Sequence, residues 1–232
     1  MPTYFEARRA SPDNRRKVEL PDYVIKELPQ DKNAKILEIG CGYGKMMTEL
    51  VTLGFSNVTG IDIDESAVQH CKNNGLNVLL INNLMEFIKG NKIPFDFVIM
   101  SHVIEHLKKD EIIPILSAIY ENALNKNGKI VILTPNAQAL VGTYWLHEDF
   151  THELIFTSGS LYYVLYMAGF RNIRFVDIYS TANLGTIKKC LRFVSLKLYE
   201  IFISFFHKLM ANAYYDKSEK IFSVELKAVA KK

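Results

Sequence analysis

An apolar run passes directly into a turn with a glycine at every second position, and this passage constrains the fold more than any other. The run covers residues 35–39, and the turn contains Gly40, Gly42 and Gly44. Residues 45–53 then repeat apolar side chains at helical spacing. A strand that enters a helix through such a turn lets backbone approach a ligand and points helix N–H groups at it.

The next apolar run, residues 57–62, ends in an acid, Asp62. A carboxylate after the second strand can accept hydrogen bonds from both hydroxyls of a ribose. The glycine turn and Asp62 together predict a site for a cofactor that contains a nucleoside.

The turn departs from the fingerprint of dinucleotide-binding enzymes. That fingerprint, G-x-G-x-x-G, requires a third glycine where this chain has Lys45. Glu38, two residues before Gly40, would repel a pyrophosphate but suits an ammonium group. A nicotinamide-dependent oxidoreductase is therefore disfavoured and kept as an alternative, together with a protein that binds a cofactor without catalysis.

This pattern resembles class I S-adenosylmethionine-dependent methyltransferases, over residues 33–178 and again over 220–232. The resemblance implies S-adenosylmethionine as the cofactor and S-adenosylhomocysteine as the product. It also implies a Rossmann-like α/β fold, which is a doubly wound, seven-stranded, mostly parallel sheet with an antiparallel last strand. An N-terminal helical arm and a helical insertion before the last strand would complete the fold.

Short apolar runs alternate with helical patterns along the chain, which is typical of a parallel sheet covered on both faces. Strands are expected at residues 35–39, 57–62, 77–81, 95–100, 129–133, 171–178 and 221–229. Helices are expected at residues 21–28, 44–53, 65–73, 84–89, 110–124 and 158–168. Asp64 and Asp110 should cap two of these helices, and Gly75 should end one.

We expect a single methyltransferase domain over residues 1–232. Its parts in chain order are an arm at 1–30, a cofactor-binding core at 33–180, a helical insertion at 181–218 and a final strand at 219–232. The arm is basic, and a helix start is expected at residues 11–13. It is either solvated or a flap over the cofactor or an anionic substrate.

Composition narrows the function classes. The chain is 49% hydrophobic and 23% charged, as in ordinary globular proteins, and its net charge of +3 is too small to indicate nucleic acid. Three cysteines without metal-like spacing predict free thiols in a reducing compartment. The first residues lack an apolar signal core, so we expect a cytoplasmic protein, with peripheral contact at the inner membrane surface as an alternative.

The insertion repeats apolar residues every three or four positions over 187–210, and basic residues decorate its start. Three interpretations stay open. The helix packs on its own domain or on a second copy as a homodimer, it rests on a membrane surface, or it covers the acceptor site as a lid.

The resemblance assigns the cofactor to residues near the ends of the first four strands. They are Glu38, Gly40, Cys41, Gly42, Tyr43, Asp62, Ile63, Asn83, Ser101 and His102. Glu38 would hold the turn and the cofactor's ammonium, and Ile63 would lie against adenine. Asn83 would accept a hydrogen bond from the adenine amino group, although it is also suited to cap the next helix. Ser101 and His102 would lie beside the methionine end.

Titratable side chains are dense at residues 146–153, where an acceptor would enter. A hydroxyl acceptor benefits from a general base. We expect His152 to be that base, with Asp149 orienting it or binding substrate, and with His102 and His147 in reserve. A solvated loop is the competing interpretation. The spacing of His147 and His152 fits no zinc pair, so we predict no metal site.

The same stretch resembles a subgroup of bacterial methyltransferases linked to surface-polysaccharide biosynthesis. The matching residues are Asp149, His152, Phe156 and Thr157. The resemblance implies O-methylation of a small-molecule or glycan acceptor, namely a sugar or related group of capsule or lipopolysaccharide. A lipid, a quinone or another small molecule stays open as the acceptor, and no motif indicates a nucleic acid.

Overall fold

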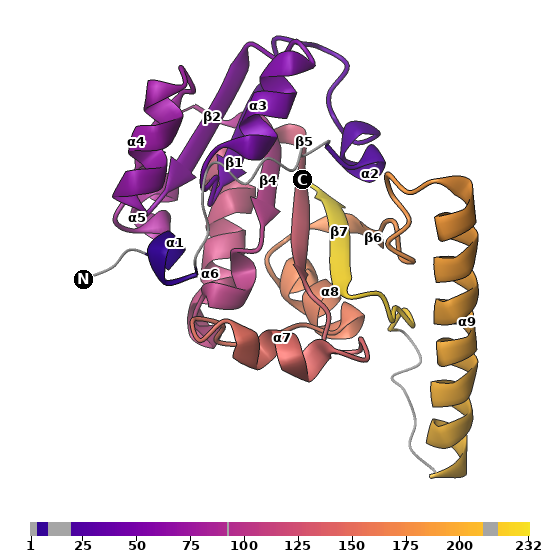
Figure 1. Ribbon diagram of the computed structural model, residues 1–232. Coiled ribbons are helices and arrows are strands. Elements are labelled where there is room, and N and C mark those ends of the chain that lie inside the picture. Colours follow the sequence, from indigo (N-terminus) through magenta and orange to yellow (C-terminus); the bar gives the residue numbers. More distant parts are fainter. Residues whose placement is uncertain (1–3, 9–19, 92, 211–217) are drawn as a thin grey trace. The chain divides into compact units, whose positions relative to one another are not determined.

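The computed structural model describes residues 4–8, 20–91, 93–210 and 218–232. The helix start expected at residues 11–13 lies outside these ranges. The strands form a seven-stranded sheet in the order β3-β2-β1-β4-β5-β7-β6, which confirms the expected α/β fold (Figure 1).

The strands and helices follow the expected alternation. The strands are β1 Lys35–Ile39, β2 Asn57–Asp62, β3 Val78–Leu80, β4 Phe95–Ser101, β5 Leu124–Pro135, β6 Arg171–Phe175 and β7 Glu225–Lys231. The first helices are α1 Tyr4–Ala7, α2 Asp22–Ile25, α3 Lys45–Thr52, α4 Glu65–Asn73 and α5 Leu84–Gly90. The later helices are α6 Lys109–Ala118, α7 Gly142–Glu148, α8 Ser158–Met167 and α9 Thr186–Leu209.

The chain divides into two compact units. The first contains residues 1–101, 118–130 and 232, and the second contains residues 102–117 and 131–231. These boundaries follow spatial proximity and differ from the sequence divisions expected above. The expectation of one domain stays a prediction.

In the first unit, β1 lies between β2 and β4, and both pairings are parallel (Figure 1). Ile39 pairs with Ile61 on one side and with Met100 on the other. All three side chains are almost fully buried. The residues that follow them, which include Asp62 and Ser101, therefore emerge at one edge of the sheet, where ligands bind in open α/β sheets.

In the second unit, β7 pairs antiparallel with β6, as expected for the last strand. Thr157 begins α8, because its side chain accepts a hydrogen bond from the Ser160 N–H while the Ser160 hydroxyl accepts from the Thr157 N–H. Phe156, just before this cap, is buried and pairs with Asn136.

The structure corrects three local expectations. The connection between the fifth strand and the helix expected at residues 158–168 contains a helix, α7, where none is expected from the sequence. Strand β5 begins at Leu124, where Asn125 donates a 2.6 Å hydrogen bond to Asp96 of β4. Asp110 lies inside the first turn of α6 and is not its cap. Tertiary contacts override local preference in such places.

The two other expected helix boundaries are confirmed. The Asp64 side chain accepts a hydrogen bond from the Ala67 N–H and caps α4. Gly75 follows the same helix with a φ of +74°, in the left-handed region that glycine enters readily.

Candidate active site

The glycine turn after β1 is held against the end of β2 by backbone hydrogen bonds. The N–H groups of Gly40 and Cys41 both donate to the carbonyl of Ile61, at 2.8 and 3.1 Å. Gly40 and Gly42 have φ values of +69° and +50°, which residues with a Cβ rarely adopt. The turn thus needs glycine and presents backbone at the sheet edge, as the sequence predicts.

Asp62 is central to this part of the site. Its Oδ2 accepts from the Gly42 N–H at 2.7 Å, and its Oδ1 accepts from the Asp64 N–H at 2.9 Å. A carboxylate offers about four acceptor positions, so two bonds leave capacity for ribose hydroxyls. The geometry fits the predicted ribose contact.

Glu38 is a buried acid in β1, paired in register with Gly60 of β2. Within the described part of the chain, its Oε2 has no hydrogen-bond partner. Burial, followed by the nearby Cys71 and Asp62, raises the pKa of Glu38 to about 8. A buried carboxylate oxygen without a partner is suited to an ammonium group, so this site fits the amino acid end of S-adenosylmethionine.

Apolar groups border the turn. The Phe5 ring of α1 lies 4.7 Å from the Tyr43 ring, centroid to centroid, and its edge approaches Gly42. Ile63 exposes 74% of its surface, as an apolar platform for adenine requires. Cys41 is buried beneath the turn, and the Cys71 thiol donates to the Gly42 carbonyl. The contact by Phe5 agrees with a flap role for the arm.

Two further residues predicted to bind the cofactor, Asn83 and Ser101, lie at the boundaries of secondary-structure elements. The Asn83 side-chain oxygen accepts from the Glu86 N–H at 3.0 Å and caps α5. This supports the capping alternative, and a contact with adenine stays a prediction. Ser101 ends β4 at the same edge as Asp62.

His102, in the second unit, lies between two acids. Its Nδ1 and Nε2 each lie 3.1 Å from a carboxylate, of Glu105 and Glu225 respectively. Desolvation of the ring lowers its pKa, but these two hydrogen bonds outweigh it and raise the pKa to about 10. The imidazolium has no lone pair to accept a proton, so the structure argues against His102 as a reserve base.

Asp149 and His152 lie near each other, but not within the distance of a hydrogen bond that would orient the His152 ring. The Nε2 of His152 is 4.0 Å from Asp149 Oδ2. Asp149 Oδ1 instead accepts from the Thr151 N–H and hydroxyl at 3.1 and 2.7 Å. The Nδ1 of His152 lies 2.7 Å from the carbonyl of Trp145, which only a protonated Nδ1 can satisfy. In the neutral ring the lone pair that a base needs is then on Nε2.

His152 also belongs to a group with Glu105 and His106. One ligand atom from each of the three lies within 4.8 Å of the others, close enough to hold a metal ion. Desolvation lowers the pKa of His106, which favours the neutral ring. From the sequence alone, the Glu105–His106 pair is expected to brace the loop after β4 rather than to do chemistry. His147, the histidine that the sequence places near His152, is exposed on α7.

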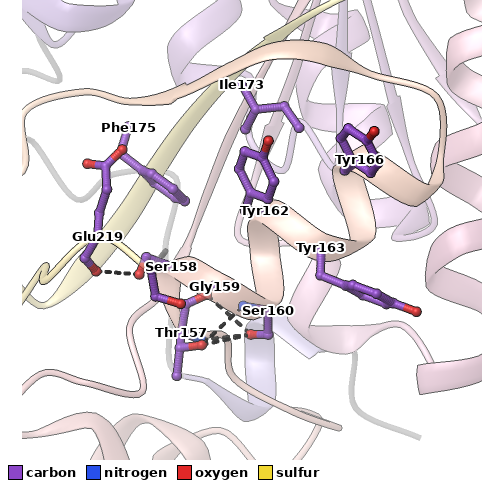
Figure 2. Close-up of a pocket in the computed structure, with 11 residues that line it drawn as sticks. Thr157, Ser158, Gly159, Ser160, Tyr162, Tyr163, Tyr166, Ile173, Phe175 and Glu219 are labelled. Atoms are coloured by element: carbon purple, nitrogen blue, oxygen red, sulfur yellow. Dashed lines mark hydrogen bonds between the residues drawn. The ribbon is translucent and has the colours of Figure 1, made fainter. Parts of the chain in front are cut away.

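A separate pocket of about 650 Å³ lies in the second unit, and none of the predicted site residues lines it. Figure 2 shows three tyrosines of α8, Tyr162, Tyr163 and Tyr166, along one side of this pocket. Ser158 donates to the Glu219 carbonyl at its edge. Of the residues singled out in the sequence, Thr157 lines it.

Comparison with known families finds one domain model over most of the chain. A family described as "Methyltransferase domain" matches residues 13–174. This range includes the glycine turn, Asp62 and the stretch that contains His152.

Comparison with curated proteins finds relatives over shorter ranges. A protein of Rickettsia canadensis named "Ubiquinone biosynthesis O-methyltransferase" is 36% identical over 95 residues, which are 38% of this chain and 39% of that protein. A protein of Rickettsia felis with the same name is 31% identical over 130 residues, which are 53% of this chain and 48% of that protein. The chain thus spans less than half the length of these curated relatives.

A solved structure of a SAM-dependent methyltransferase from Archaeoglobus fulgidus superimposes on the chain with a TM-score of 0.67. The alignment covers 99% of this chain and 98% of the other, at 22% identity. Because the two sequences are only 22% identical, this similarity is evidence for a shared fold alone.

Proposed function

Because this chain belongs to the methyltransferase domain family and is an S-adenosylmethionine-dependent methyltransferase, we propose that it methylates the hydroxyl group of a quinone-type phenolic ring. The names of its Rickettsia relatives support this acceptor class. A quinone acceptor is also one of the alternatives that the sequence leaves open.

The observation that carries the proposal is the hydrogen bond from His152 Nδ1 to the Trp145 carbonyl. In the neutral ring this hydrogen bond leaves the lone pair on Nε2, the nitrogen that can accept a proton. A phenolic hydroxyl has a pKa near 10, as in tyrosine, whereas an aliphatic hydroxyl is a far weaker acid. A histidine base is therefore better matched to a phenol than to a sugar.

Different residues of this chain would bind the cofactor and remove the acceptor's proton. S-adenosylmethionine supplies an activated methyl group, whose carbon bonds to the acceptor oxygen as its bond to sulfur breaks. Asp62 and Glu38 would hold the ribose and ammonium groups of that cofactor. The Nε2 of His152 would take the acceptor's proton, and Asp149 would stabilise the charged ring from 4.0 Å.

A polysaccharide acceptor is the competing proposal, and the structure gives it less support. Phe156 is buried beside Asn136, and Thr157 caps α8. These two residues of the matching pattern have structural roles that any acceptor class would require. Neither curated relative described above has a name that refers to polysaccharide.

A methyl-transfer panel tests the acceptor. Labelled S-adenosylmethionine is offered with catechols that carry short and long prenyl tails, with nucleotide-sugars and with lipopolysaccharide fractions. We expect label in the catechols. Label confined to a sugar or lipopolysaccharide fraction would overturn the quinone proposal and support the polysaccharide one.

The same assay tests His152. We expect His152→Gln to lower kcat by about 10² to 10⁴-fold, since this is the usual contribution of a general base. His147→Gln, five residues away on the exposed side of α7, is the matched comparison. A loss below about tenfold at His152, or a larger loss at His147, would reject His152 as the base.

A further inference from the structure

Helix α9 presents an apolar stripe to solvent along its whole length. It spans Thr186–Leu209, is drawn in orange to gold in Figure 1, and contains no fully buried residue. Eight large apolar side chains share one face at helical spacing, each exposed by 46 to 78%. They are Ile187, Leu191, Val194, Leu198, Ile201, Phe202, Phe205 and Leu209, which we call the apolar stripe of α9.

The opposite face of α9 is attached to its own unit. The Tyr199 ring meets the Phe222 ring edge to face, with centroids 5.4 Å apart. The Phe193 ring meets Tyr179 at 4.8 Å, and the Arg192 guanidinium donates to the Ser180 carbonyl at 2.6 Å. These contacts fix the rotation of the helix about its axis, so the stripe points away from the described residues of its unit.

The charge of α9 indicates what covers the stripe. The helix carries five basic residues, Lys188, Lys189, Arg192, Lys197 and Lys208, and one acid. That acid, Glu200, already forms a 2.8 Å salt bridge with Lys197. A second copy would therefore bring a helix with the same positive surplus and no unpaired acid, whereas an anionic lipid surface complements the charge and accepts the apolar side chains.

We propose that α9 lies in the plane of an anionic membrane surface, with its apolar stripe among the acyl chains and its lysines at the lipid headgroups. Among the described helices, none is long and apolar enough to cross a bilayer. The binding is thus peripheral, and its strength combines apolar burial with attraction that salt screens. This inference rests on α9 and not on the identity of the acceptor.

Sedimentation of the full chain with lipid vesicles tests the proposal. We expect binding to vesicles of phosphatidylcholine mixed with phosphatidylglycerol, weak binding to phosphatidylcholine alone, and release at high salt. Lys188→Gln with Lys189→Gln should weaken binding by about 30-fold, since each basic residue near an anionic surface contributes about 1 kcal/mol.

Substitutions in the stripe separate specific insertion from general attraction. Leu198→Ser with Ile201→Ser should lower vesicle binding by about tenfold or more, because two apolar side chains leave the acyl region. Val51→Ser with Ile93→Ser, which alters comparably exposed apolar residues of the first unit, should leave vesicle binding unchanged. Calorimetry with S-adenosylhomocysteine confirms that each variant is folded.

Two results would overturn the proposal. The first is vesicle binding that is absent, or that the stripe substitutions do not affect. The second is a dimer in light scattering that Leu198→Ser with Ile201→Ser dissociates, which would assign the stripe to a second copy. Neither result depends on whether the methyl acceptor is a phenol, so failure here leaves the proposed function standing.

Discussion

The backbone N–H of Gly42 donates a 2.7 Å hydrogen bond to Oδ2 of Asp62, and so joins the glycine turn to the end of strand β2. One carboxylate therefore holds the turn and faces the predicted ribose position. The Asp62 side chain is therefore expected to contribute both to stability and to cofactor binding.

Asp62→Ala should lower both cofactor affinity and stability. Hydrogen bonds to a charged group contribute about 1.5–3 kcal/mol, so we expect the affinity for S-adenosylhomocysteine to fall by about 10- to 100-fold in calorimetry. Asp64→Ala is the control, because it removes the cap of α4 and costs about 0.5–2 kcal/mol of stability without touching the predicted ribose site. Unchanged affinity in Asp62→Ala would refute the ribose assignment.

Glu38→Gln should change how stability depends on pH. The pKa of Glu38 is about 8 in the folded protein, because burial raises it from the ordinary glutamate value of 4.5. Between these values the folded chain binds one more proton than the unfolded chain, so Glu38 lowers stability as pH rises, by about 1.4 kcal/mol per pH unit. In thermal unfolding without cofactor, the stability of Glu38→Gln relative to the wild type should therefore increase as the pH rises from about 5 to about 8.

The same residue predicts a proton released on cofactor binding. Near neutral pH Glu38 is protonated, and an ammonium beside its Oε2 would favour the ionised form. The heat of binding S-adenosylhomocysteine should therefore vary with the ionisation enthalpy of the buffer in the wild type and not in Glu38→Gln. A wild-type heat that is the same in every buffer would place the ammonium elsewhere.

Chelation distinguishes two uses of the group formed by Glu105, His106 and His152. If His152 Nε2 accepts a proton, the reaction needs no ion there, and we expect EDTA to leave methyl transfer unchanged. Transfer that is lost on chelation and returns with Mg²⁺, Mn²⁺ or Zn²⁺ would show that the group holds a metal. Calorimetric titration of Mn²⁺ into the wild type and His106→Gln gives a readout that does not depend on activity.

Gly142→Ala should destabilise the segment that carries the acceptor side. A Cβ at Gly142 would lie 2.8 Å from the carbonyl oxygens of both Asn136 and Ala137, which are backbone atoms with little freedom to move. We expect a loss of about 1–3 kcal/mol in denaturant unfolding. Gly90→Ala, at the end of α5 with no atom within 4 Å, should be neutral or stabilising. Equal losses of stability in Gly142→Ala and Gly90→Ala would contradict the steric explanation.

The sequence by itself determined the parallel core, and it predicted the glycine turn and the acid at one edge of that core. Asp62 is the last residue of β2, and Gly40 and Gly42 lie in the turn that follows β1; parallel strands necessarily end at one edge of the sheet. The spacing of residues along a strand or turn is local information, so periodicity and turn chemistry suffice to predict it.

Only the tertiary structure decided how the polar side chains are used. His102 is held charged by Glu105 and by Glu225, and Glu225 lies 123 positions further along the chain. The side-chain oxygen of Asn83 accepts a hydrogen bond that caps α5. The His152 ring is oriented by its hydrogen bond to the carbonyl of Trp145 rather than by Asp149. A side chain's hydrogen-bond partner depends on which segments the fold brings within about 3 Å, and no local pattern encodes that distance.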